Sequence, residues 1–223
     1  MIELKNYYPV IKRNTLFRDS DINDLEPLLS NLDHYVNSYE KGESVISVGS
    51  EITSLAILLE GEVIITQIDF WGNQNIISKI TEGQMFGEAV ACLKDNISDV
   101  EVVVSKDAIV LFIAIENIIN LKNDRPKHLA LQRNLLQALA MKNVLLKSKI
   151  DYLSKRSIRG KVLAFLSHES HRLKSADFKI AYNRQELADY LSVDRSALSK
   201  ELMRLKKDGY LDYNRNHFVL HQI

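Results

Sequence analysis

Residues 183–202 read NRQELADYLSVDRSALSKEL, and their pattern predicts two helices joined by a three-residue turn. Asn183 is a suitable N-cap for the first helix, and Glu186 three residues later completes a capping box. Asp194 ends the turn and can cap the second helix through its carboxylate. Leucines at core spacing line one side of each helix. We therefore expect a helix-turn-helix, a unit that reads DNA.

The second helix is expected to present a polar face to the major groove. The residues predicted to contact bases or phosphates are Tyr182, Arg184, Gln185, Arg195, Ser196, Ser199 and Lys200. The last four lie near the N-terminus of the second helix, where a recognition helix meets base edges. The first three lie near the N-terminus of the first helix, a position suited to backbone phosphates. An ordinary amphipathic helix pair with solvated charges is the alternative interpretation.

The residues after the second helix favour the DNA-binding interpretation. Asp208 and Gly209 stop the helix, with glycine at a left-handed position, and short β-segments at 210–213 and 218–220 flank the next turn. This order is typical of a winged helix-turn-helix. Residues 1–155 contain 16 Lys and Arg against 21 Asp and Glu, whereas 156–223 contain 13 against 8. A basic C-terminal part suits phosphate binding.

The turn contains one residue that conflicts with its expected geometry. Ser192 stands where glycine is common in such turns. It must therefore adopt an unfavourable left-handed backbone conformation, or else the turn geometry shifts.

The N-terminal part predicts many short strands. Six of the eight glycines lie between residues 42 and 87, and they separate β-branched runs. Strands are expected at residues 35–39, 44–46, 55–59, 63–68, 75–80, 100–104 and 108–113. None contains proline, which favours a small antiparallel barrel or roll. A short helical region around residues 21–32 precedes it, and Pro27 is expected to start or interrupt that helix.

A long helix is predicted between the two parts, opening at Pro126 and ending near Ser154. Apolar residues recur along it at a and d positions of a heptad, which predicts a parallel homodimer. The expected seam contains Leu129, Leu136, Leu139, Asn143, Leu146, Ile150 and Leu153. Asn143 would be the buried polar residue that fixes register. A surface helix packed on its own domain could show a similar stripe.

These features predict an α+β chain with three parts: an antiparallel β-roll of the jelly-roll type over 1–118, a dimerisation helix over 119–154 and a winged helix-turn-helix over 155–223. Ser157 is placed to cap the helix that enters the last part. No apolar run reaches the roughly 20 residues of a membrane span, and no signal peptide is evident, so the cytoplasm is the expected location. The single Cys92 excludes an internal disulfide and a four-cysteine metal cluster.

The order of a β-roll, a long helix and a winged helix-turn-helix resembles the Crp/Fnr superfamily of bacterial transcription regulators across nearly the whole chain. The motifs that carry the resemblance are Leu59-Glu60-Gly61-Glu62-Val63, Phe86-Gly87-Glu88, Arg184-Gln185-Glu186 and Asp194-Arg195-Ser196. The resemblance implies a homodimer that binds an approximately palindromic double-stranded DNA site and contacts RNA polymerase. It also implies that Arg195 reads a guanine, while Ser196 replaces a glutamate that reads cytosine, so the operator should differ.

The resemblance places a ligand pocket at Phe86, Gly87, Glu88, Ser98, Asp99 and Leu145. In members that bind cyclic AMP, a Gly-Glu pair binds the ribose, and an Arg-Ser-Ala segment holds the cyclic phosphate through its arginine. Gly87 and Glu88 match the pair, but Ser98-Asp99-Val100 replaces the segment, and Asp99 would repel a phosphate. Val144 and Leu145 replace a Thr-Ser pair that contacts adenine. We therefore expect no useful binding of cyclic AMP or cyclic GMP.

Other classes of function fit the sequence less well. A cupin-type enzyme also has a β-roll but needs strand histidines for its metal, and residues 35–127 contain no histidine. No catalytic residue, cofactor or metal site is therefore expected. A sensor or scaffold of the same fold that no longer binds DNA is the remaining alternative, and the polar face of Arg195, Ser199 and Lys200 argues against it. The hairpin tip at Phe70 and Trp71 could cover a pocket or contact a partner, although packing on its own roll is expected.

Overall fold

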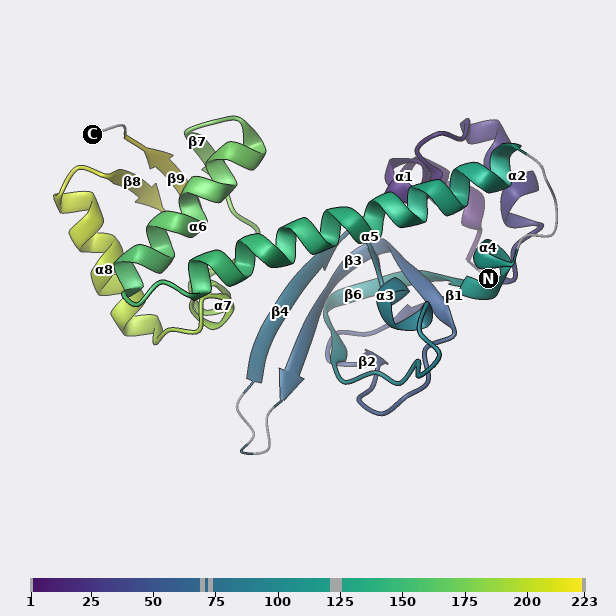
Figure 1. Ribbon diagram of the computed structural model, residues 1–223, viewed down its shortest axis with the longest axis horizontal. Helices are drawn as coiled ribbons and strands as arrows, with labels where there is room; N and C mark the ends of the chain where they lie inside the picture. The colour runs from purple at the N-terminus through teal and green to yellow at the C-terminus, as the bar shows by residue number, and fades with distance from the viewer. Residues whose placement is uncertain (1, 69–70, 72–73, 121–125, 222–223) are drawn as a thin grey trace. The chain divides into compact units, whose positions relative to one another are not determined.

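The computed structural model describes residues 2–68, 71, 74–120 and 126–221 (Figure 1). They form two compact units, Met1–Gln67 with Ser78–Lys142 and Ile68–Ile77 with Asn143–Ile223. Helix α5 (Pro126–Leu153) contributes to both units and ends one residue before the predicted boundary. Within the described residues, every helix is too short or too polar to span a lipid bilayer. Phe70, at the predicted hairpin tip, lies outside the described residues.

The first unit is built on an antiparallel sheet in which two long strands pair with four shorter ones. The strands are β1 (His34–Tyr39), β2 (Ser44–Ile46), β3 (Ser54–Ile68), β4 (Gln74–Thr81), β5 (Met85–Phe86) and β6 (Glu101–Ala114). Their order is β1-β6-β3-β4, with β2 also on β6 and β5 also on β3. The register pairs Tyr39 with Ala108 and Val63 with Val104. The predicted roll is confirmed.

Gly61 was expected to separate two strands, and this expectation is wrong. Residues 55–59 and 63–68 belong to the single strand β3, and residues 101–104 and 108–113 belong to β6, which begins one residue later than expected. The pairing shifts register between Leu58 and Val63, which marks a bulge. Gly61 has a φ of 90°, and an added Cβ would lie 2.1 Å from the carbonyl oxygen of Asp107. The glycine therefore bends a continuous strand where another backbone passes closely.

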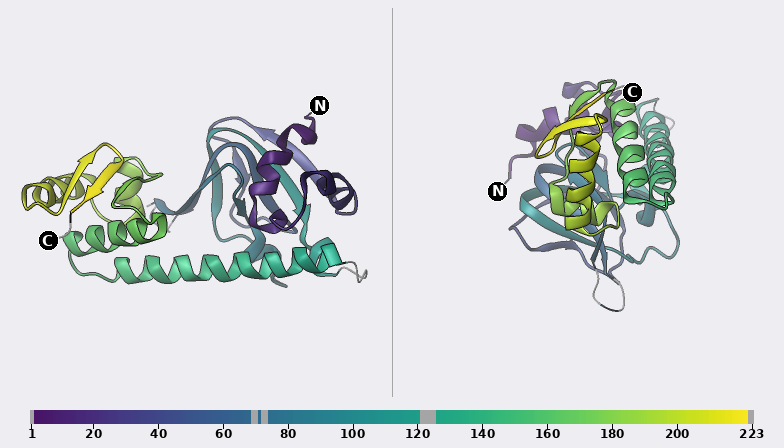
Figure 2. Two further views of the ribbon diagram at one scale, coloured as in Figure 1. Left: turned by 90° about the horizontal axis from the view of Figure 1, so that it is seen from above. Right: turned by 90° about the vertical axis from the view of Figure 1, so that its left-hand side faces the viewer.

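Short helices surround the sheet, and two expectations about them are corrected. The helices are η1 (Leu4–Tyr7), α1 (Tyr8–Arg13), η2 (Thr15–Phe17), α2 (Ile22–Leu29), α3 (Glu88–Ala91) and α4 (Ile115–Ile119). Pro27 neither starts nor interrupts α2; it lies inside the helix, two residues before its end at Leu29, where its missing N–H leaves the carbonyl four residues earlier without the usual helical donor. The alternative to a ligand role for Glu88 is a hydrogen-bonded carboxylate at a strand end, but Glu88 is the first residue of α3, after Gly87, whose φ is 78°. Figure 2 shows α1 and α2 in purple beside the strands.

The core of the first unit includes one side of α5. Phe17, Phe86 and Leu111 are fully buried, and Leu131, Leu135 and Ala138 of the helix join the same cluster. Because these positions follow one another by three or four residues, they form a single helical stripe. The first half of α5 is thus anchored on the roll, while its other faces remain exposed.

The second unit has the predicted winged helix-turn-helix. Its elements are α6 (Ile158–Leu173), β7 (Asp177–Lys179), α7 (Arg184–Tyr190), α8 (Arg195–Lys207), β8 (Leu211–Asn214) and β9 (His217–Leu220). The strands pair in the order β7-β9-β8. Phe165, Leu198, Leu202 and Phe218 are buried in its core. Ser157 caps α6 as expected, because its hydroxyl accepts a 3.0 Å hydrogen bond from the Gly160 N–H.

Candidate functional site

Both helix caps predicted for the helix-turn-helix are confirmed. The Asn183 side chain accepts from the Glu186 N–H at 3.0 Å, and the Glu186 carboxylate accepts from the Asn183 N–H at 2.7 Å. The Asp194 carboxylate accepts from the Ala197 N–H at 2.8 Å and from the Ser196 hydroxyl at 2.6 Å. The Ser196 hydrogen bond, together with the Ala197 N–H, holds the pKa of Asp194 below its usual value. The carboxylate thus stays ionised at the positive end of α8.

The turn between α7 and α8 adopts the left-handed conformation expected for it. Ser192 has a φ of 51°. The Ser192 N–H donates to the Asp189 carbonyl at 3.1 Å, and the Val193 N–H donates to the Ala188 carbonyl at 3.0 Å. These bonds close the end of α7 and set the direction in which α8 begins.

The N-terminal end of α8 carries the exposed polar face. Arg195, Ser196 and Lys200 are exposed, and Ser199 is half-buried, with its hydroxyl donating to the Arg195 carbonyl at 2.9 Å. The opposite face holds the buried residues Leu198, Leu202 and Leu205 of this helix. A guanidinium, an ammonium and two hydroxyls are suited to hydrogen bonds with base edges and phosphates. The four predicted residues on α8 therefore form one surface.

The three predicted contact residues around the start of α7 differ in their exposure and in their side-chain contacts. Gln185 is exposed, and its amide donates to the Asp189 carboxylate at 2.8 Å. Arg184 donates to the Arg215 carbonyl at 3.0 Å and is half-buried, which lowers its pKa. Tyr182 stacks on Tyr190 with ring centres 4.5 Å apart, and burial raises its pKa. The side chains of Arg184 and Tyr182 thus also stabilise the domain.

The buried carboxylate of Glu88 is the centre of the predicted ligand pocket. Its side chain is 1% exposed, and the Lys142 ammonium lies 2.6 Å from Oε1. Lys142 also donates to the Met85 carbonyl at 2.7 Å. Glu88 Oε2 has no hydrogen-bond partner among the described residues. An ion pair between α3 and the long helix therefore engages one oxygen of Glu88 and leaves the other without a partner among the described residues.

Lys142 was not predicted as a site residue. A signal was present, because Lys142 continues the helical stripe of Leu131, Leu135 and Ala138 that packs on the roll. A lysine on a core-facing stripe needs a partner, and Glu88 provides it.

Of the other predicted pocket residues, some are buried in the roll and others are exposed. Phe86 is fully buried, and Gly87 precedes α3. Ser98 is buried, and its hydroxyl both donates to the Val100 carbonyl and accepts from the Val100 N–H. Asp99 is exposed, and Leu145, 44% exposed, belongs to the second unit. The Ser98 hydroxyl is therefore engaged by its own loop.

Two sequence models match the chain, one in each half. The model of the cyclic nucleotide-binding domain matches residues 36–125, and the model of the Crp-like helix-turn-helix domain matches residues 160–223. Together the matched residues make up more than half of the chain. The chain belongs to the Crp/Fnr superfamily of transcription regulators. Comparison with curated proteins found no match.

Solved structures of other proteins share this fold at low sequence identity. FixK2 from Bradyrhizobium japonicum is 17% identical with a TM-score of 0.66, over 86% of this chain and 94% of that one. A CooA mutant from Carboxydothermus hydrogenoformans is 19% identical with a TM-score of 0.70, over 88% and 86%. The c-di-GMP-responsive regulator CLP from Xanthomonas campestris is 17% identical with a TM-score of 0.68, over 91% and 100%.

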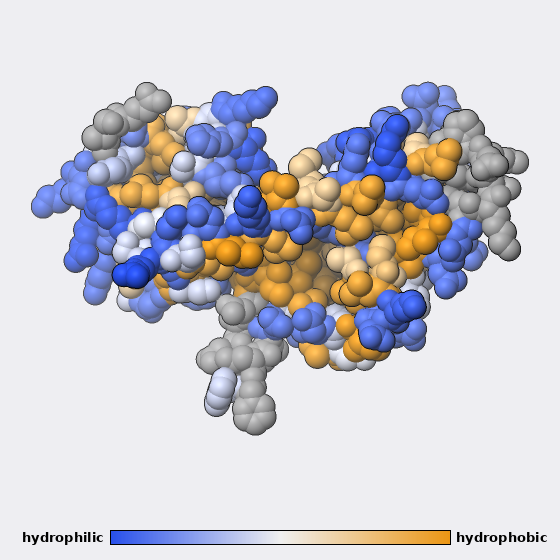
Figure 3. Space-filling view, viewed as in Figure 1, coloured by the Kyte–Doolittle hydropathy of each residue, from blue (hydrophilic) through white to orange (hydrophobic). Residues whose placement is uncertain are grey.

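In this Crp/Fnr chain, most of the predicted dimer seam is uncovered. Leu129, Leu136, Leu146 and Ile150 are between 52% and 69% exposed. Asn143 is also exposed, whereas Leu139 and Leu153 are half-buried. Leu153 packs on the core of the second unit. Hydrophobic side chains gather along α5 in the space-filling view (Figure 3).

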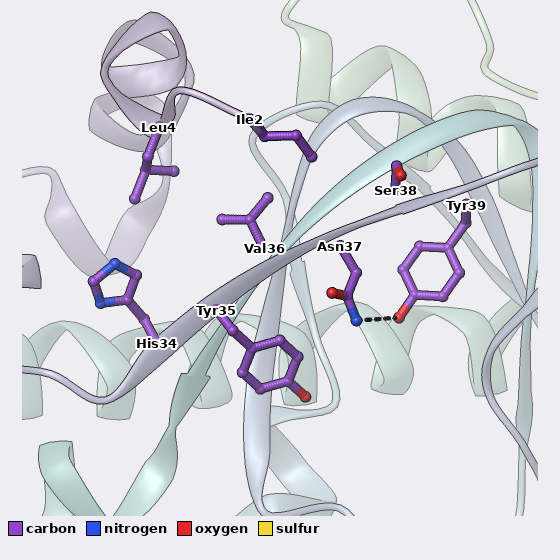
Figure 4. A pocket seen from close by; sticks show the side chains of 8 residues that line it. All are labelled: Ile2, Leu4, His34, Tyr35, Val36, Asn37, Ser38 and Tyr39. Carbon is purple, nitrogen blue, oxygen red and sulfur yellow. Dashed lines mark hydrogen bonds between the residues drawn. The ribbon is translucent and has the colours of Figure 1, made fainter.

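Three further features of this Crp/Fnr chain bear on ligand binding. The described residues contain no group of three or more His, Cys, Asp or Glu arranged to hold a metal ion. Cys92 is half-buried, and burial together with nearby Glu88 raises the pKa of its thiol. A hollow along β1 is lined by Ile2, Leu4 and the strand residues His34 to Tyr39 (Figure 4). None of the predicted ligand residues lines this hollow.

Proposed function

We propose that the protein is a dimeric, sequence-specific DNA-binding transcription regulator whose roll does not respond to cyclic AMP. The observation that carries the proposal is the exposed polar face at the start of α8, with Arg195, Ser196 and Lys200 presented together. Capping by Asp194 directs the start of the helix, and the buried leucines hold its other side. Such a face on a winged helix-turn-helix is suited to the major groove.

Each residue on this surface has a proposed role. Arg195 donates to a guanine, as its planar guanidinium can bind O6 and N7 together. Lys200 binds a base or a phosphate, and Gln185 binds backbone phosphate near the start of α7. Ser196 already donates to Asp194, so towards DNA its hydroxyl oxygen is free to accept. Because the serine hydroxyl is shorter than a glutamate side chain and uncharged, we expect it to select less strictly for cytosine, so the operator should differ at this base pair.

The exposed stripe on α5 supports dimerisation through this helix. Leu136 and Ile150 are each 69% exposed, and large apolar side chains exposed in a row along a helix mark a contact surface. A second copy of α5 would cover them. A two-fold dimer then presents two recognition helices to half-sites about one helical turn, roughly 34 Å, apart. The operator is accordingly an approximate palindrome.

The contacts of the roll support a sensor that has lost its cyclic-nucleotide chemistry. A cyclic phosphate needs a cation, and residues 92–104 contain no arginine, whereas Asp99 adds a negative charge. Glu88 Oε1 is paired with Lys142, which leaves only the buried Oε2 for a ribose hydroxyl. Ser98 is bonded within its own loop. We expect no heat of binding when cyclic AMP or cyclic GMP is titrated calorimetrically, and micromolar affinity would overturn this part of the proposal.

DNA selection tests the central proposal. The purified protein is incubated with random duplexes, and the retained DNA is sequenced and rebound at rising salt concentration. We expect a palindromic consensus and an affinity that falls steeply with salt. A protein with Arg195→Ala and Lys200→Ala is the control and should select no consensus. Failure of the wild-type protein to retain any DNA would favour the scaffold alternative.

A seam variant tests dimerisation separately. Ile150→Lys places a charge in the proposed interface, and Lys147→Met alters a neighbouring exposed residue as its control. Native mass spectrometry should give a dimer for the wild-type protein and the control, and a monomer for Ile150→Lys. The same measurement reveals any bound small molecule as added mass. A monomeric wild-type protein would contradict the dimer.

A further inference from the structure

The turn of the helix-turn-helix contains an unfavourable backbone conformation that needs compensation. Ser192 has a φ of 51°, a region that L-residues other than glycine rarely occupy because Cβ crowds the following carbonyl. Ser192 lies three residues before Arg195, the first residue of α8. A relaxation of this turn would therefore shift the start of the recognition helix.

Helix α6 supplies a cation directly behind the turn. The Lys161 ammonium donates to the Leu191 carbonyl at 3.2 Å and to the Ser192 carbonyl at 3.4 Å. Both carbonyls lie at the C-terminal end of α7, where the helix has no backbone donors left and carries partial negative charge. The half-buried ammonium thus satisfies two acceptors in the conformation that Ser192 adopts.

A second cation of α6 holds the other side of the same motif. Arg159 lies 2.8 Å from the Asp208 carboxylate and 3.5 Å from the Glu201 carboxylate, and it stacks over the Tyr210 ring at 4.7 Å. Arg159 therefore secures the body and the end of α8. Lys161 secures its beginning, because among the described residues its side-chain partners are the turn carbonyls.

We propose that Lys161 is a positioning residue for DNA recognition, which stabilises the left-handed turn at Ser192 and so fixes the direction of the recognition helix. The inference rests on the proposed DNA-binding function. It assigns Lys161 no contact with DNA: the ammonium acts through the turn carbonyls on the placement of Arg195 and Lys200. Lys161 and Ser192 should therefore be coupled, since glycine at 192 needs no compensation.

Four proteins test the coupling: wild type, Lys161→Met, Ser192→Gly and the double variant. Methionine keeps the length of the side chain and removes its charge. We expect Lys161→Met to weaken binding to the selected operator about tenfold, with a smaller effect on random DNA, as loss of a charged hydrogen bond implies. Ser192→Gly in the same protein should restore most of the operator affinity. Lys161→Arg, which keeps a charged donor, should retain more affinity than Lys161→Met.

The chain offers a matched control for relief of strain. Lys174 also has a positive φ, 52°, and it is exposed at the C-terminal cap of α6. Lys174→Gly removes a left-handed non-glycine residue and one charge, but away from the turn. Combined with Lys161→Met, it should restore no operator affinity.

Denaturant unfolding separates this inference from the proposed function. The loss of stability caused by Lys161→Met should be smaller when position 192 is glycine, whether or not DNA is bound. If the wild-type protein selects no DNA site but this coupling is present, the proposed function fails and the turn contact stands. Equal weakening on operator and random DNA, with no restoration by Ser192→Gly, would overturn the positioning role. Additive stability effects would overturn the contact itself.

If Lys161→Met does not fold, Lys161→Gln replaces it in the same cycle. The amide still donates one hydrogen bond but carries no charge. It should give an intermediate loss of operator affinity that Ser192→Gly reduces. No dependence on residue 192 would again contradict the inference.

Discussion

The helix-turn-helix caps its two helices with residues only three positions away, whereas the predicted ligand pocket obtains its polar contacts from a distant helix. The Asn183 side chain accepts from the Glu186 N–H, and the Asp194 carboxylate accepts from the Ala197 N–H, each across three positions. Lys142 reaches the Met85 carbonyl across 57 positions and pairs with Glu88 beside it. The motif satisfies its capping groups locally, while the pocket retains one unpartnered carboxylate oxygen. Local capping thus defines where the helices of the proposed DNA-binding surface begin, and tertiary packing defines the polar contacts of the predicted ligand pocket.

The largest effect is expected in the pocket, where the two partners of the ion pair are unequally buried. The Glu88 side chain is 1% exposed and that of Lys142 is 39% exposed. Lys142→Met leaves a buried carboxylate without its cation and should lower the free energy of unfolding by about 3 kcal/mol. Glu88→Gln leaves a lysine that can turn to solvent and should cost about 1 kcal/mol. Urea denaturation measures both.

Equal stability losses for these two variants would show that the ion pair is effectively solvated. Lys147→Met, on the same helix but exposed, is the control and should leave the unfolding midpoint unchanged. A change in the control would mean that charge on α5, rather than the pair, governs stability.

The next largest effect is expected at the proposed DNA-binding surface, where Arg195 lies. Arg195→Ala should reduce operator affinity by roughly 1 to 3 kcal/mol and relax the preference at one base pair. Competition binding with operators changed at single positions measures this. Lys207→Ala, on the last turn of α8, removes a charge far from the N-terminal face and should leave the base preferences intact. Unchanged preference in Arg195→Ala would remove this arginine from base reading.

The smallest effect concerns Lys149, a half-buried cation in the second unit that no local motif explains. The Lys149 ammonium donates to the carbonyls of Ile76 and Ile77, both at 3.0 Å, and lies 4.0 Å from the centre of the Tyr190 ring. Burial lowers its pKa from 10.5 to about 8. Between these values the unfolded chain binds more protons than the folded one, so stability should rise with pH in this window.

Comparison with Lys149→Met isolates this titration. From pH 8 towards 10, the wild-type protein should gain stability relative to the variant, by at most about 1 kcal/mol because the ammonium is partly exposed and its carbonyl partners favour the charged form. Denaturant unfolding at several pH values measures the difference. Buried tyrosines titrate alike in both proteins. Parallel pH profiles would show that Lys149 keeps an ordinary pKa.

Local rules predicted the elements whose determinants are close in sequence. The two caps, the left-handed Ser192 and the end of the long helix are confirmed. The turn expected at Gly61 is wrong, since a glycine that bends a strand and one that ends a strand leave the same sequence pattern. β5 and β7 contain two and three residues, too few to show a period.

The contacts of three lysines could not be predicted from the sequence either. None of Lys142, Lys149 and Lys161 was predicted to make a tertiary contact, yet each donates to backbone carbonyls of another part of the fold. Helical periodicity indicates which face they occupy, but it does not indicate what lies opposite.

The sequence was sufficient for the order of roll, long helix and winged helix-turn-helix, and for the polar face that Arg195 and Lys200 present. Capping, hydrophobic periodicity and turn chemistry act over a few residues, so they can be recognised in the sequence. The pairing of Glu88 with Lys142, the bend at Gly61 and the contact of Lys161 with the turn depend on segments brought together by folding. A buried charge or a left-handed residue is stabilised by whatever atoms lie next to it, and only tertiary packing determines those neighbours.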